Sequence, residues 1–186
     1  MNEVLKAISE RYSCRDFTGV PLAQGEIQAI AAAAAEAPSA NNSQRWRIYA
    51  ITSKPLIDEL EAEGMSVMAN MPDKSMYERI QSRGGKLFYS APALFIVAIE
   101  KAAGAGAVLD CGIVCENIAI AAAGIGAQSC ICGLAGLAFS AGKRDSFARR
   151  IGFPEGYEFG IAVLLGREKS HGAPHAPDLS KISYIA

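Results

Sequence analysis

The spacing of apolar residues along the chain predicts helices and strands in a mixed order. Strands are indicated where apolar and polar residues alternate, or where a short apolar run is rich in β-branched residues: 46–52, 93–100, 127–132 and 157–166. Helices are indicated where apolar residues recur every three or four positions: 3–11, 22–36, 55 to about 64, 105–123 and 141–151. We therefore expect a single α+β domain over 1–186, with about four strands and an extended arm over 168–186.

Residues 65–90 carry a weaker pattern that includes four methionines. They could fill the core by ordinary helix packing, which we favour, or line a mobile lid. The helix expected over 105–123 is apolar on nearly every side, which indicates burial on most faces. Asp110, Glu116 and Asn117 interrupt its apolar run, and three polar groups there argue against a membrane span.

Composition narrows the possible functions. Hydrophobic residues make up 51% of the chain and the mean hydropathy is +0.17, which indicates a large apolar subunit interface. The net charge of -1 argues against nucleic acid as a partner, because neutralising phosphates needs a basic face. The start lacks the pattern of a signal peptide, so we expect a cytoplasmic protein whose five cysteines are reduced thiols.

The stretch "RYSCRDF", residues 11–17, is the first candidate for ligand binding. Alternate side chains of an extended segment share one face, so Arg11, Ser13 and Arg15 would point the same way. Two guanidinium groups and a hydroxyl suit a phosphate dianion, because arginine offers paired donors and keeps its charge. The alternative is a solvated polar turn.

Two further stretches could contact a ligand through neutral groups. "APSANNSQRW", residues 37–46, carries amide and hydroxyl side chains that suit the edge of a heterocycle, although a helix-capping loop has the same composition. The glycines of "GIGAQSCICGL", residues 124–134, would let a backbone N–H approach a ligand. The chain has neither GxGxxG after a strand nor GxxxxGK[ST], so it lacks both common phosphate-binding loops.

The cysteines and histidines indicate no metal site and no catalytic side chain. Two cysteines lie four apart on an expected helix and two alternate on an expected strand, and neither spacing is typical of zinc or iron–sulfur sites. Both histidines lie in the C-terminal arm, so no Ser–His–Asp or Cys–His arrangement can be argued.

Together these segments resemble the nitroreductase family of FMN-dependent flavoproteins, over nearly the whole chain. The resemblance rests on five stretches in the family's order: "RYSCRDF", "APSANNSQRW", "FYSAPALFIVA", "DCGIVCENIAIAAAGIGAQSCICG" and "GYEFGIAVLLG". It implies a central, mainly antiparallel sheet of about four to five strands, flanked by helices in an intertwined homodimer. It also implies hydride transfer from NADH or NADPH through FMN to a small electron-poor acceptor, such as a nitro compound or a quinone.

The resemblance further implies which residues hold FMN. One subunit would grip the phosphate and ribityl chain through Arg11, Ser13 and Arg15, with the Tyr12 backbone alongside. A backbone N–H at Cys132 and Gly133 would face the reactive flavin nitrogen. The residues that would reach the flavin from the other subunit are Pro38, Ser39, Asn42 and Gln44.

Two positions depart from the family pattern. Arg45 replaces the proline of a common "QPW" triplet, and His175 falls where the C-terminal arm usually brings a basic residue to the phosphate. Histidine is only partly charged near neutral pH, so the phosphate would rest mainly on Arg11 and Arg15. Lys86 is a weak candidate for a contact with the flavin pyrimidine.

Two other functions fit the same resemblance. A relative with the same fold could carry out dehalogenation, enone reduction, dehydrogenating oxidation or flavin fragmentation, although residues 65–90 look short for an elaborate lid. A non-enzymatic FMN protein could store flavin or sense redox state through Cys14 or Cys132.

Overall fold

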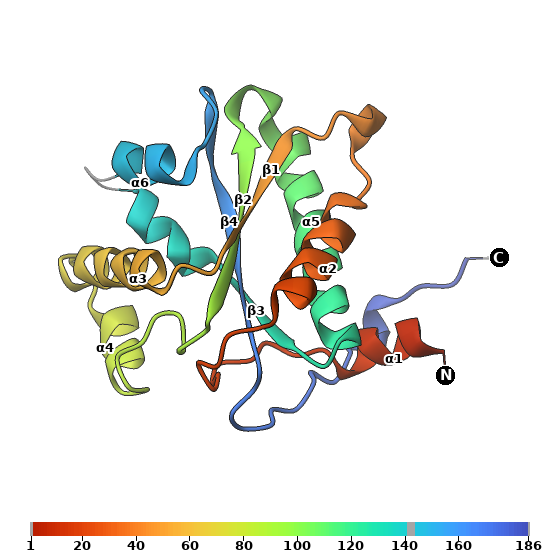
Figure 1. The fold of residues 1–186 in the computed structure, drawn as a ribbon. Helices are drawn as coiled ribbons and strands as arrows, with labels where there is room; N and C mark the ends of the chain where they lie inside the picture. Colours follow the sequence, from red (N-terminus) through yellow and green to blue (C-terminus); the bar gives the residue numbers. More distant parts are fainter. Residues whose placement is uncertain (1, 141–143, 186) are drawn as a thin grey trace.

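The computed structural model describes residues 2–140 and 144–185 and contains a four-stranded antiparallel sheet (Figure 1). The strands lie in the order β1-β2-β4-β3. Their bounds are Trp46–Ile51 for β1, Ala93–Glu100 for β2, Gln128–Cys132 for β3 and Tyr157–Gly166 for β4. All four lie within two residues of the ranges predicted from the sequence, and every ladder is antiparallel, so the expected α+β sheet is confirmed.

Helices cover both faces of the sheet (Figure 1). One apolar core lies under α3, α4, α6 and a 3-10 segment, Gly133–Phe139; the other lies under α2 and α5. The helix bounds are α1 Glu3–Glu10, α2 Gln24–Ala35, α3 Lys54–Ala69, α4 Ser75–Gln81, α5 Gly104–Gly124 and α6 Arg144–Ile151. Part of the helix expected over 141–151 lies outside the described residues, at 141–143.

The α3 helix is longer than the sequence pattern predicted, because it continues past Gly64. A Cβ on Gly64 would lie 2.7 Å from Leu87 Cδ2, so the glycine makes room for a core side chain instead of ending the helix. Met68 is buried, and Met65 and Met76 pack against the same core. These contacts support the core interpretation of the methionines.

The helical segment Lys101–Gly124, which contains α5, is long and apolar enough to cross a membrane, judged by length and composition alone. In the fold it packs between the sheet and the outer helices, with eight buried residues. Its Asn117 side chain donates a hydrogen bond to the Ala33 carbonyl of α2 at 2.9 Å. This hydrogen bond joins α5 to α2. The burial expected on most faces of α5 is only partly found in one chain, because Val108 and Leu109 are exposed.

Candidate cofactor site

The segment that follows α1 extends the sheet beyond β3. The Cys14 N–H donates to the Ser129 carbonyl at 2.9 Å, and Ser13 forms a parallel bridge with Ser129. Tyr12 and Cys14 are buried in the core, whereas Ser13 and Arg15 are partly or fully accessible. The alternation expected from the sequence therefore holds. The side chains of Arg11, Ser13 and Arg15 lie on the accessible side of this hydrogen-bonded backbone, the arginine segment (residues 11–15).

The two arginines of this segment differ in their surroundings. Arg11 is the C-cap residue of α1, and its Nε lies 3.4 Å from a carboxylate oxygen of Glu116 on α5. The same Nε is buried and has no aligned hydrogen-bond acceptor. Arg15 is exposed, and no carboxylate of the described residues forms an ion pair with it; its one hydrogen bond is to the Ser13 carbonyl at 3.5 Å. Both guanidinium groups therefore have donors free for an anion.

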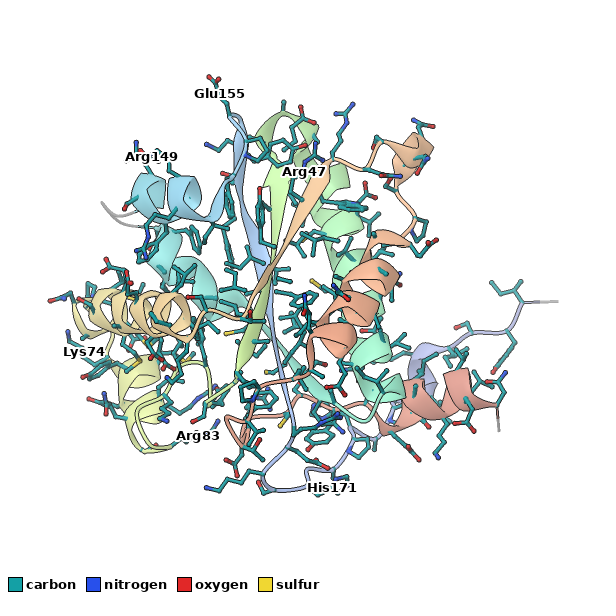
Figure 2. All side chains as sticks on the ribbon, viewed as in Figure 1. Arg47, Lys74, Arg83, Arg149, Glu155 and His171 are labelled. Atoms are coloured by element: carbon teal, nitrogen blue, oxygen red, sulfur yellow. The ribbon has the colours of Figure 1, made fainter. Side chains whose placement is uncertain are left out.

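The start of the C-terminal arm runs antiparallel beside residues 16–18. The Thr18 N–H donates to the Arg167 carbonyl at 3.0 Å, and the Lys169 N–H donates to the Asp16 carbonyl at 2.8 Å. The Ser170 hydroxyl donates to the Asp16 carboxylate at 2.7 Å. These bonds join segments far apart in sequence, and Figure 2 shows the arm at the lower edge of the molecule, where His171 is labelled.

The buried Tyr12 holds the start of the C-terminal arm in place. The Tyr12 hydroxyl donates to the Glu168 carboxylate, whose other partner is His171 Nδ1 at 3.2 Å. Burial and this hydrogen bond raise the pKa of Tyr12, and the same bond lowers the pKa of Glu168. A Cβ on Gly172 would lie 2.4 Å from Tyr12 Cε2, so only glycine lets the arm cross the ring this closely.

The C-terminal arm and the segment that follows α1 together line an open cavity of about 310 Å³. Ser13 and Arg15 line one side of it, and Gly172 and His175 line the other. The structure thus brings His175 to the same cavity as Ser13 and Arg15. Three predicted residues from opposite ends of the chain share one space that offers a cation, a hydroxyl and an imidazole.

A second, apolar cavity of about 390 Å³ lies on the α5 side of the sheet. Ile131 of β3, Ile161 of β4 and Gly112 of α5 contribute to its lining. Ile131 is 44% exposed, although its neighbours Cys130 and Cys132 are buried. Ser129 and Ile131 are two residues apart on β3, so they lie on the same face of the strand. Ser129 pairs with Ser13 of the first cavity, and Ile131 lines the second. The predicted Cys132–Gly133 position is therefore close in sequence to residues beside both cavities.

The buried thiols near this strand are poor nucleophiles. Burial raises the pKa of the Cys130 thiol to about 11 and also raises the pKa of Cys14 and Cys132. A thiol with a raised pKa is almost wholly protonated at neutral pH, and the thiolate is the reactive form. The geometry therefore disfavours redox sensing through Cys14 or Cys132.

The loop between α2 and β1 is the other predicted contact region. Its residues Asn42 and Gln44 have positive φ, and the Gln44 side-chain amide donates to Asn42 Oδ1 at 2.8 Å. The Ser39 hydroxyl accepts a hydrogen bond from the Gln44 N–H at 2.9 Å. Pro38 is exposed, and so are Asn42 and Gln44. The loop is thus an ordered group of accessible amides and hydroxyls.

This loop lies far from the arginine segment of the same chain. Arg45 accepts a backbone bond from Glu100, at the end of β2, whereas Phe17 bonds to Tyr89, just before β2 begins. A strand of this length spans roughly 25 Å at about 3.3 Å per residue. Figure 1 shows the loop at the upper end of the sheet and residues 11–17 at the lower end. One chain therefore cannot bring both predicted groups to one ligand.

Two positions that the sequence left uncertain have defined partners. Arg45 Nε lies 3.8 Å from the Glu100 carboxylate, so its charge is partly compensated within the chain. Lys86 Nζ donates to the Ser90 hydroxyl at 2.8 Å, and both residues line a polar cavity of about 220 Å³. Sequence reasoning missed Glu116 and Glu168 as members of the site, because only tertiary contacts show what they face.

Comparisons with known proteins identify relatives of this chain. The model of the nitroreductase family matches residues 8–167. A nitroreductase with bound FMN from Desulfitobacterium hafniense DCB-2 is 48% identical, with 100% of both chains covered and a TM-score of 0.98. A nitroreductase with bound FMN from Bacteroides fragilis NCTC 9343 is 26% identical, again with 100% of both chains covered and a TM-score of 0.90.

A more distant structure shares the fold alone. The FMN-dependent nitroreductase NfnB from Mycobacterium smegmatis, in complex with NADPH, is 18% identical to this chain. The match covers 99% of this chain and 98% of the other, with a TM-score of 0.75. A search of curated protein sequences found no significant match.

Proposed function

Since this chain belongs to the nitroreductase family, we propose that it binds FMN and passes hydride from NADH or NADPH to an electron-poor acceptor. Bound FMN would supply the redox chemistry, since it can accept and donate hydride. Nitro compounds and quinones are the acceptor classes we propose. The single observation that carries the proposal is the cavity where Ser13, Arg15 and His175 converge.

Arg15, which lines this cavity, and Arg11, which precedes it in the same segment, fit the phosphate end of FMN. Arg15 has no carboxylate partner among the described residues, and Arg11 has a buried Nε without an aligned acceptor. Arginine donors paired with phosphate oxygens form strong charge-assisted hydrogen bonds. The Ser13 hydroxyl would add a neutral donor, and the His175 imidazole would add another donor from the C-terminal arm. The phosphate would therefore rest mainly on Arg11 and Arg15.

The apolar cavity on the α5 side of the sheet supports a place for a flat ring. Gly112 in its wall has no side chain, and a Cβ there would meet nothing within 4 Å. Ile131 offers an exposed apolar surface. Backbone groups at Cys132 and Gly133 would orient the ring. We assign no side chain as an acid or base, because the protein's part is to position the ring and exclude water.

We propose further that the working unit is a homodimer. The amide loop at Ser39, Asn42 and Gln44 lies at the opposite end of the sheet, so it would meet the flavin held by a second copy. Apolar side chains that a second copy would cover are exposed on α1, α5 and the arm: Val4, Leu5, Ile8, Val108, Leu109, Leu179, Ile182, Tyr184 and Ile185. All five cysteines are free, which supports a reducing, cytoplasmic location.

Removal of residues 176–186 tests the dimer. Tyr184 and Ile185 are 92% and 96% exposed in one chain, so we expect their burial to come from the partner subunit. Burying each large apolar side chain is worth roughly 1.5–3 kcal/mol, so the shortened chain should dissociate at concentrations where the full chain is dimeric. Light scattering after size exclusion measures this. A shortened chain that stays fully dimeric would contradict a role for the arm in assembly.

An anaerobic visible spectrum tests the proposed reaction. We expect the purified protein to show a flavin band that bleaches when NADH or NADPH is added without oxygen, and returns when a quinone is added. A band that persists with both donors would favour another electron donor or a flavin-storage protein. A colourless protein that takes up no FMN would contradict the cofactor itself.

Alternative reactions on the same fold remain distinguishable by product. Dehalogenation, enone reduction or flavin fragmentation would each give a product that mass spectrometry separates from a reduced nitro compound. The structure offers no specific observation that favours one of these over acceptor reduction.

A further inference from the structure

Arg11 differs from Arg15 in having a carboxylate at its inner edge. The Glu116 carboxylate lies 3.4 Å from Arg11 Nε, and this Nε is shielded from solvent. We infer that Glu116 is a positioning residue that holds the Arg11 guanidinium by its Nε edge and thereby directs its Nη donors to a phosphate. The inference rests on the proposed binding of FMN.

The geometry of the guanidinium group explains this assignment. Its five N–H donors form a rigid planar fork, so fixing one edge also fixes the directions of the others. A ligand cannot reach the buried Nε, and among the described residues no hydrogen bond uses the Nη groups of Arg11. The side chain as a whole is 29% exposed. The Nη edge is therefore what Arg11 can offer to an incoming anion.

The backbone on both sides of the ion pair is held in place. Arg11 caps α1 through its N–H, which donates to the Ala7 carbonyl at 3.0 Å. Glu116 is flanked by Cys115, which is buried, and by Asn117, which is hydrogen-bonded to α2. The backbone of both Arg11 and Glu116 is therefore held in place, and only their side chains can move relative to each other. Without Glu116, the long arginine side chain would sample several rotamers, and ordering it again would cost binding free energy.

Glu116 could instead weaken phosphate binding by repulsion. Its side chain is 45% exposed, so solvent and salt screen its field at the distance of a ligand on the far edge of the fork. The Nε contact is shielded and only 3.4 Å long, so it is screened much less. The orienting effect should therefore exceed the repulsion.

The test compares FMN with riboflavin, which lacks the phosphate, in titrations of the flavin-free, full-length protein. Glu116→Ala should raise the Kd for FMN about fivefold, the value of one ordinary ion-pair contact, and leave riboflavin unchanged. Glu116→Gln, which keeps an oxygen beside Nε but loses the charge of the ion pair, should give a Kd between those of the wild type and Glu116→Ala. Glu78→Ala, which removes an exposed carboxylate from α4, is the matched control and should change neither Kd.

A double-mutant cycle makes the test specific. In an Arg11→Ala background, Glu116→Ala should have no further effect on FMN, because the group it positions is gone. The inference is overturned if Glu116→Ala tightens FMN, weakens both flavins equally, or has no effect in a protein that prefers FMN to riboflavin. A wild-type protein that binds neither flavin would overturn the proposed function itself, and this inference with it.

Discussion

Replacing Arg11 and Arg15 together with alanine is expected to weaken FMN binding by about 10²- to 10⁴-fold while leaving the subunits folded and assembled. Each charge-assisted hydrogen bond to a phosphate contributes roughly 1.5–3 kcal/mol, and two such contacts are lost. Fluorescence titration with FMN measures the change, and circular dichroism with size exclusion checks fold and assembly. Riboflavin should bind the variant about as well as it binds the wild type.

The matched control removes two arginines that do not face the site. Arg83 follows α4 and Arg149 lies on α6; both are exposed, and neither lines the cavity at Ser13 and Arg15. The Arg83→Ala, Arg149→Ala variant has the same change in net charge and should keep its full affinity for FMN. If the Arg11, Arg15 variant still purifies with a full complement of flavin, the phosphate assignment is wrong.

Substituting Gly160 with alanine is expected to lower the free energy of unfolding by about 2–3 kcal/mol, as overpacking in a close-packed interior does. Gly160 is the extra residue of a β-bulge, because Val97 pairs with Ile161 while Ala98 pairs with Phe159. A Cβ there would lie 2.8 Å from the Val97 carbonyl oxygen and 3.0 Å from Cys111 Sγ. A backbone oxygen cannot rotate away, so the sheet itself would have to shift.

Thermal unfolding at a fixed protein concentration measures this effect, which corresponds to a fall in Tm of about 5–10 °C for a chain of this size. The control is Gly25→Ala in the first turn of α2, where a new Cβ would meet nothing within 4 Å. Alanine favours helix over glycine, so this variant should be unchanged or slightly more stable. Equal Tm values for the two variants would show that the bulge accommodates a side chain.

The sequence predicted the elements best where the local signal was strong. The apolar run of β2 was found at its observed bounds, because a strand that is buried on both faces has a continuous apolar pattern. The ends of α5 were found to within one residue, although Val108 and Leu109 on this helix are exposed. The prediction failed at Gly64, where glycine was read as a helix end. A side chain at this position would collide with Leu87. Leu87 is far from Gly64 in sequence, so no local pattern could indicate this contact.

The sequence by itself determined the arginine segment, since alternation in an extended chain already put Arg11, Ser13 and Arg15 on one face. It also indicated an apolar surface larger than one subunit needs. Only the tertiary structure decided that the C-terminal arm returns across Tyr12 and brings His175 to the same cavity. Only it placed Glu116 beside Arg11, and the loop at Asn42 at the far end of the sheet. The physical reason is that side-chain periodicity depends on neighbours along the chain, whereas a binding site is formed by contacts between distant segments.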